Sequence, residues 1–162
     1  MKMNDKYIQY DVEYISGVMS LREPQKRSLE ILHDIMSNTD IRRDSKEKVL
    51  EYINNKYPIC TDFERNFISL TFALATGVGK TRLMGTFITY LYTNHNIKNF
   101  LVVAPNTTIY EKLKMDLGGI GSSKYVFNGL GCFTTPPRII TDDNYAYYRN
   151  DIFNSDVNIF IY

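Results

Sequence analysis

Residues 67–82 read Phe-Ile-Ser-Leu-Thr-Phe-Ala-Leu-Ala-Thr-Gly-Val-Gly-Lys-Thr-Arg, and this stretch decides the fold. An apolar run leads into a glycine-containing turn, which ends in Gly79-Lys80-Thr81 at the start of a segment with helical periodicity. The order strand, loop, helix is the setting that a phosphate-binding loop needs. The stretch therefore predicts an α/β fold with a mainly parallel sheet flanked by helices.

The chemistry of the turn, residues 75–82 (the phosphate loop), points to a nucleotide. Gly77 and Gly79 can adopt backbone conformations closed to other residues, and they let the main chain approach an anion. Successive N–H groups then form a concave anion nest, to which the start of the next helix adds. Lys80 supplies a point charge for the β- and γ-phosphates, and Thr81 places a hydroxyl where a phosphate-bound Mg²⁺ would lie.

The match to the phosphate-loop pattern is incomplete. The strict pattern is G-x-x-x-x-G-K-[ST], and Leu74 stands at its first glycine position. The alternative is a chance Gly-x-Gly turn before a helix. The intact core of residues 76–81 between two fitting elements favours the phosphate loop.

Composition indicates a globular protein in the cytoplasm, with no membrane association. The chain has 162 residues, of which 44% are hydrophobic and 23% charged, and its net charge is +1. This balance neither requires nucleic acid nor forbids a local basic groove. The charged run 40–48 is interpreted as a solvated connection rather than a nucleic-acid patch. Cys60 and Cys132 lack metal-ligand spacing, which favours free, mostly buried thiols over a disulfide.

Local patterns predict the elements around the phosphate loop. Residues 7–20 suggest an irregular or short-stranded lead-in, and Pro24 opens a helix that runs to about residue 37. Ser45 can cap a second short helix, and the apolar run 67–74 is predicted to be a buried strand.

The pattern downstream of the loop predicts a parallel β–α–β unit. The helix after the loop is followed by a second buried strand at 100–104. Thr108 opens another helix through a capping box, and Gly118 is placed as its C-terminal cap before a loop. Short strands are predicted at 125–127, 138–141 and 157–162.

Three segments together resemble a known motor. They are Leu21-Arg22-Glu23-Pro24-Gln25-Lys26-Arg27, the phosphate loop, and Val102-Val103-Ala104-Pro105-Asn106. In order and spacing they resemble superfamily 2 helicases of the DEAD/DEAH type, most of all the Res subunit of type III restriction enzymes. The resemblance covers about residues 18–162 and implies a RecA-like fold, with a lead-in at 1–20 and the N-terminal part of the helicase ATP-binding domain at 21–162.

The resemblance also implies which residues bind ATP and Mg²⁺. Gln25 matches the glutamine that reads the adenine edge, a role suited to an amide with both donors and an acceptor. Arg22 would flank the base, and Arg82 would reach a phosphate. A solvent-facing position on the helix is the alternative for Gln25, and a surface position is the alternative for Arg82. The implied nucleotide-binding residues are Arg22, Gln25, Thr76, Gly77, Val78, Gly79, Lys80, Thr81 and Arg82.

Asn106 and Thr107 match the turn with which these motors contact the nucleic-acid backbone. A helix N-terminus with Asn and Thr side chains suits phosphate and is blind to base sequence. Simple helix capping is the alternative, and it is assigned to Thr108.

The acidic motif that such motors need is not evident. Asp142-Asp143 is the nearest candidate, with a helix N-cap in the loop as its alternative. The favoured interpretation is that 157–162 is another core strand and that the chain stops before the motif. We therefore expect a fragment that binds ATP but hydrolyses it poorly.

The sequence predicts the ATP-binding part of an ATP-dependent DNA helicase or translocase from a type III restriction or defence system. Expected partners are nucleic acid, DNA rather than RNA, and a modification or nuclease domain or subunit. Two alternatives stay open: a non-catalytic ATP-binding module, and a small-molecule kinase that uses the same loop.

Overall fold

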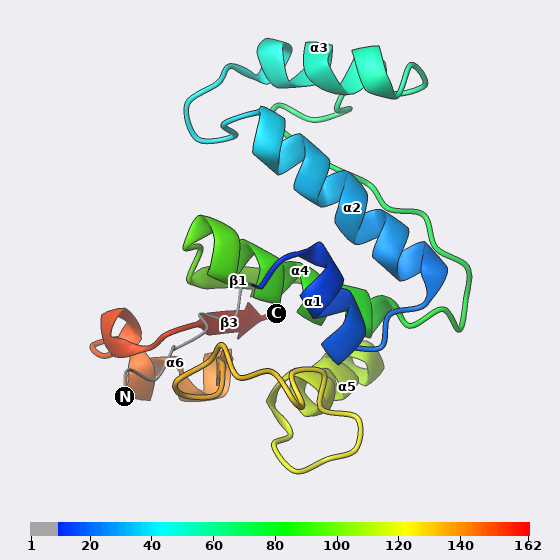
Figure 1. Ribbon diagram of the computed structural model, residues 1–162. Coiled ribbons are helices and arrows are strands. Elements are labelled where there is room, and N and C mark those ends of the chain that lie inside the picture. The colour runs from blue at the N-terminus through cyan, green and yellow to red at the C-terminus, as the bar shows by residue number, and fades with distance from the viewer. Residues whose placement is uncertain (1–9) are drawn as a thin grey trace, which may run out of the picture. The chain divides into compact units, whose positions relative to one another are not determined.

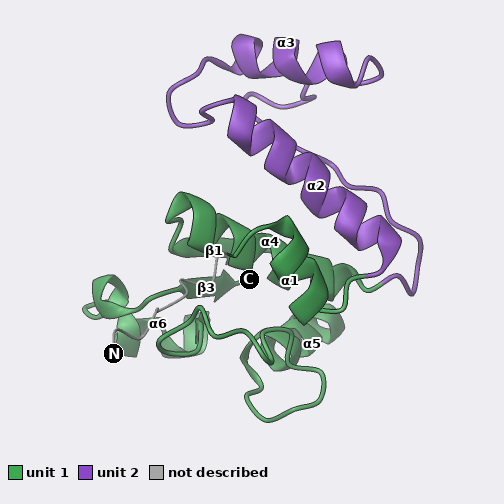
Figure 2. Cartoon of the chain, in the orientation of Figure 1, with its two compact units in different colours: residues 1–21, 79–162 green, residues 22–78 purple. Residues whose placement is uncertain are grey.

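The computed structural model describes residues 10–162, and the chain divides into two compact units (Figure 2). Unit 1 comprises residues 1–21 and 79–162, and unit 2 comprises residues 22–78. In sequence, unit 2 is therefore an insertion within unit 1. The predicted boundary between the lead-in and the ATP-binding domain is a functional one and stays a prediction.

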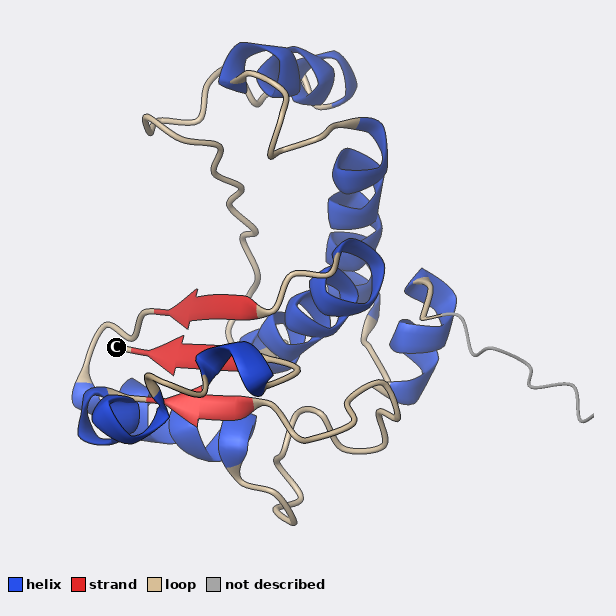
Figure 3. Ribbon diagram, turned by 90° about the vertical axis from the view of Figure 1, so that its left-hand side faces the viewer, coloured by secondary structure: helices blue, strands red, loops and turns tan. Residues whose placement is uncertain are grey.

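Unit 1 contains a three-stranded parallel sheet (Figure 3). Its strands are β1 (Asn99–Val102), β2 (Arg138–Ile140) and β3 (Asn158–Ile161), in the order β1-β3-β2. Ile159 on the central strand pairs with Phe100 on one side and Ile139 on the other. The parallel sheet and the strands predicted near these three positions are confirmed.

Within residues 10–162, four α-helices accompany this sheet in unit 1 (Figure 1). They are α1 (Val12–Val18), α4 (Lys80–His95), α5 (Thr107–Gly118) and α6 (Asp142–Tyr148), and a short 3₁₀ helix η1 (Ile152–Asn154) precedes β3. α5 packs on β2 and β3, while α1 packs on α4. The side chains that form the core of this unit are Ile88, Val102, Leu113, Leu117, Phe127, Val157, Ile159 and Ile161.

Strand β1 is less buried than its apolar sequence predicts. Val102 is buried, but Leu101 and Val103 are exposed. Successive side chains of a strand point to opposite faces of the sheet, and Val102 belongs to the core cluster that includes Leu113 and Leu117 of α5. The prediction of a fully buried second strand is therefore wrong for one face.

α5 approaches β2 closely at its C-terminal end. A Cβ atom added to Gly118 would lie 2.5 Å from Cγ1 of Ile139, so the absent side chain makes room for the strand. The predicted C-cap is wrong by one position. The cap is Gly119, whose N–H donates to the Met115 carbonyl at 2.8 Å.

The predicted irregular or short-stranded lead-in at 7–20 is wrong where the structure describes it, because residues 12–18 are helical. Asp11 caps α1, accepting a hydrogen bond from the Tyr14 N–H at 2.8 Å. Ile15 and Met19 are both buried, and their four-residue spacing is that of one helix face. Residues 7–9 lie outside the described part of the chain.

Two predicted strands do not form. Residues 67–74 have no regular secondary structure, and residues 125–127 lie in turns. A strand needs a neighbour to accept and donate its backbone hydrogen bonds, and the described residues of unit 2 contain no strand. In the second segment, Phe127 is buried in the core of unit 1 without joining the sheet.

Unit 2 is built on the two predicted helices, α2 (Glu23–Asn38) and α3 (Lys46–Lys56). As expected, Ser45 caps α3: its side chain accepts a hydrogen bond from the Lys48 N–H at 3.3 Å. The core of this unit consists of Ile35, Val49, Ile53 and Phe63, with Ile68 and Leu70 packed against it.

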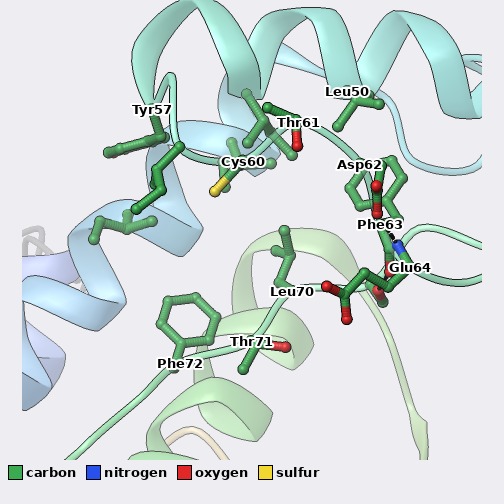
Figure 4. Close-up of a pocket in the computed structure, with 15 residues that line it drawn as sticks. Leu50, Tyr57, Cys60, Thr61, Asp62, Phe63, Glu64, Leu70, Thr71 and Phe72 are labelled. Atoms are coloured by element: carbon green, nitrogen blue, oxygen red, sulfur yellow. Dashed lines mark hydrogen bonds between the residues drawn. The ribbon is translucent and has the colours of Figure 1, made fainter.

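A hollow of about 500 Å³ opens within unit 2 (Figure 4). Leu70 points toward the segment that carries Cys60 and Thr61. Cys60 is exposed and Cys132 is partly buried, and both thiols are free. The expectation of a buried thiol is wrong for Cys60, which lies in an irregular segment after Pro58.

Candidate nucleotide site

The phosphate loop forms a tight turn at the start of α4. Gly77 has a φ of +82° and Gly79 a φ of +96°, and the Val78 N–H donates to the Ala75 carbonyl at 3.4 Å. These left-handed conformations are the ones that favour glycine, so both glycines stand where the backbone requires them. Gly79 is the N-cap of α4, and its carbonyl accepts the Leu83 N–H at 3.1 Å.

The polar side chains of the loop lie at the surface. Thr76 and Lys80 are exposed, and Thr81 is half-buried. Lys80 and Thr81 are the first two residues of α4, whose first-turn N–H groups have no acceptor one turn earlier in the helix. Main-chain donors, a cation and a hydroxyl are thus close together in sequence at the positive end of a 16-residue helix.

Arg22 joins the loop to the segment that the resemblance assigns to adenine. Its Nη1 donates to the Gly77 carbonyl at 2.9 Å across 55 positions of sequence. Both residues belong to unit 2. The structure therefore brings together two predicted site segments that are far apart in the chain, and no spacing rule predicts this contact.

Gln25 is part of the cap that begins α2. Its Oε1 accepts a hydrogen bond from the Arg22 N–H at 2.8 Å, and the residue is only 1% exposed. It does not occupy the solvent-facing position that was the alternative. Its amide oxygen orients Arg22, whose guanidinium reaches Gly77.

Arg82 binds the end of another helix in unit 1. Its Nη1 donates to the Met19 carbonyl at 3.0 Å and lies 3.5 Å from the Ser20 carbonyl. These carbonyls follow the last turn of α1, where a cation compensates the negative end of the helix. A structural role in holding α1 is therefore visible for Arg82, while its contact with a nucleotide stays a prediction.

Asn106, rather than Thr108, caps α5. Its Oδ1 accepts a hydrogen bond from the Ile109 N–H at 2.9 Å, and Thr107 and Thr108 belong to the first turn of the helix. The predicted capping role of Thr108 is wrong because the helix begins at Thr107, two residues earlier than the capping-box pattern placed it. Asn106 and Thr107 are both exposed.

Asp142 and Asp143 face the same hollow as Asn106 and Thr107. This hollow of about 410 Å³ also includes Tyr110. Both aspartates lie in the first turn of α6, so neither is the helix N-cap that the alternative interpretation expected.

The N-cap of α6 is Thr141 rather than either aspartate. Its N–H donates to Oδ1 of Asn144 at 2.8 Å, which completes a capping box. No residue of the phosphate loop lines the hollow that Asp142 and Asp143 face.

The fold and the turn define a P-loop α/β domain. The family described as type III restriction enzyme, res subunit, matches residues 18–156. The match spans most of the chain, so the chain belongs to this family and has its RecA-like P-loop fold. No curated protein and no solved structure matches the chain.

Membership fixes the general character of the chain. The family is that of a helicase-type ATP-binding module of restriction systems, and it generally uses ATP and Mg²⁺. Interaction with nucleic acid and with a modification subunit is implied at the same family level. Among residues 10–162, no helix has the length and apolar character that a membrane crossing requires.

Proposed function

We propose that this chain is the ATP-binding part of an ATP-dependent DNA helicase or translocase of a type III restriction system. The observation that carries the proposal is the hydrogen bond from Arg22 to the Gly77 carbonyl at 2.9 Å. It joins the segment proposed to read adenine to a turn whose glycines have the backbone geometry of a phosphate nest. Family membership supports the same function.

Each residue of the loop is proposed to make a different contact with ATP or Mg²⁺. Main-chain N–H groups at 76–79 would surround the phosphates, and Lys80 would bind the β- and γ-phosphates. Thr81 would offer its hydroxyl to Mg²⁺. The proposed contribution of Arg82 to ATP binding is its N–H in the first turn of α4.

The proposed nucleic-acid contact lies at the start of α5. N–H groups in the first turn of this helix, with the side chains of Asn106 and Thr107, would bind backbone phosphates without reading bases. DNA is the proposed nucleic acid, and a modification or nuclease subunit is the proposed protein partner. Restriction of DNA would take place in the cytoplasm.

Substitution of Lys80 tests the nucleotide site directly. A fluorescent ATP analogue with Mg²⁺ is titrated into the wild type, Lys80→Ala and the control Lys98→Ala, which removes an exposed lysine of unit 1 outside the loop. Loss of a charge-assisted contact is expected to weaken binding about tenfold or more in Lys80→Ala only. Its thermal unfolding should match that of the wild type, because Lys80 is exposed. Unchanged affinity in folded Lys80→Ala refutes the site.

The adenine contact is tested with Gln25→Glu. This substitution keeps an oxygen that can accept the Arg22 N–H but replaces the amide donors of Gln25. We expect ATP to lose its advantage over GTP in competition, with the fold intact by circular dichroism. A variant that still prefers ATP to the wild-type extent would remove the role proposed for Gln25.

A further inference from the structure

A small polar hollow lies in unit 1 between the end of α1, the first turn of α4 and the loop that follows α5. Its volume is about 190 Å³, and its walls include two cations, Arg82 and Lys124. Ser20, Ser123 and Asn128 add hydroxyl and amide groups. Among residues 10–162, no aspartate or glutamate lines it, and no residue of 75–81 contributes to it. The hollow therefore has the composition of an anion site that shares only Arg82 with the phosphate loop.

Arg82 is held in place at one wall. Its two hydrogen bonds to residues 10–162, to the carbonyls of Met19 and Ser20, both use Nη1. Arginine carries five N–H donors in a planar fork, so the donors on Nη2 and Nε remain for another acceptor. A guanidinium fixed on one side loses less freedom when it binds a second partner.

Lys124 lies on a loop that is anchored to the core of unit 1. Phe127 is 3% exposed, and the Val126 N–H donates to the Asp116 carbonyl at 2.9 Å. Val126 packs where Gly85 of α4 has no side chain: a Cβ there would lie 2.8 Å from its Cγ2. The loop is thus fitted to α4, and the Lys124 ammonium makes no ion pair with residues 10–162.

We propose that this hollow binds a single phosphate group. Two positive charges without a described carboxylate favour an anion. The parallel N–H donors of the arginine fork can bind two oxygens of a phosphate at once, which a monatomic ion does not offer. The phosphate belongs either to free inorganic phosphate or to the backbone of nucleic acid. This inference goes beyond the nucleotide site, because none of the residues 75–81 takes part in it.

The first test is a titration of the isotope-labelled 162-residue chain with inorganic phosphate, followed by amide chemical shifts. It uses a Lys80→Ala background, so that binding at the nucleotide loop is removed. We expect saturable shifts at 82–86 and 122–128, weakened about tenfold by Lys124→Ala. Lys124→Arg should retain binding, and the charge-matched control Lys98→Ala should leave it unchanged. Shifts that Lys124→Ala does not weaken overturn the proposal.

The second test uses single-stranded oligothymidylate to identify the source of the phosphate. If the site holds nucleic-acid backbone, the oligonucleotide shifts the same amides and inorganic phosphate competes with it. In Lys124→Ala, the slope of log binding constant against log salt concentration should then become less negative by about 0.7. If inorganic phosphate alone produces the shifts, the ligand is the free ion. Absence of local shifts with both probes overturns the site. ATP binding by the Lys80 variants is measured separately, so either proposal can fail alone.

Discussion

At the residue scale, Gly79 has a conformation that other residues adopt at a cost. With its φ of +96°, Gly79→Ala should destabilise unit 1 by about 1–2 kcal/mol and weaken ATP binding. Gly17→Ala is the matched control: a Cβ there meets nothing within 4 Å, and its φ is not left-handed. Alanine should stabilise α1 there by about 0.5–1 kcal/mol. Urea denaturation measures the unfolding free energy of both variants. Equal changes in Gly79→Ala and Gly17→Ala would contradict a strained conformation at Gly79.

The two cysteines should differ in reactivity at the same scale. Cys60 is exposed, whereas burial raises the pKa of the Cys132 thiol to about 11. Only about one Cys132 thiol in a thousand is then ionised at pH 8, and the thiolate is the nucleophile. Peptide mass spectrometry after treatment with iodoacetamide should show that Cys60 is alkylated first. The rate of alkylation of Cys132 should increase as the pH rises toward 11. In denaturant both should react alike; equal rates in the native protein would contradict the burial of Cys132.

At the scale of elements, the start of α5 separates capping from nucleic-acid binding. Asn106→Ala removes the acceptor of the Ile109 N–H and should cost about 1 kcal/mol of unfolding free energy. Thr108→Ala should change it by less than about 0.5 kcal/mol.

Asn106→Asp keeps a capping oxygen but adds a negative charge, so it should preserve stability and weaken DNA binding. Urea denaturation measures stability, and oligonucleotide titration measures DNA binding. A larger loss of unfolding free energy in Thr108→Ala than in Asn106→Ala would show that Thr108 caps the helix, as the sequence predicted.

At the scale of the whole molecule, the two units have separate clusters of buried side chains. Ile53 belongs to the cluster of unit 2 and Ile159 to that of unit 1. Alanine at either position should cost about 2–5 kcal/mol. We expect native-state hydrogen exchange to show lost protection of α2 and α3 in Ile53→Ala, and of the sheet in Ile159→Ala. Uniform loss across both units in each variant would show that the chain unfolds as one cooperative unit.

Local signals account for what could be predicted of the fold. Pro24 and Ser45 mark helix starts through contacts within a few residues, and the glycines at 77 and 79 follow from the turn itself. The run 67–74 has equally strong apolar character, but it forms no strand. Whether such a run becomes a strand depends on a neighbour elsewhere in the chain, which composition does not specify.

The sequence by itself determined the phosphate loop, the helix that follows it and the family of the protein, because these depend on residues adjacent in the chain. Only the tertiary structure decided that Arg22 reaches Gly77, and that Arg82 and Lys124 share one polar hollow. The two pairs of residues lie 55 and 42 positions apart in the sequence (77 − 22 and 124 − 82). The packing of helices and loops sets such distances, and no local pattern encodes them.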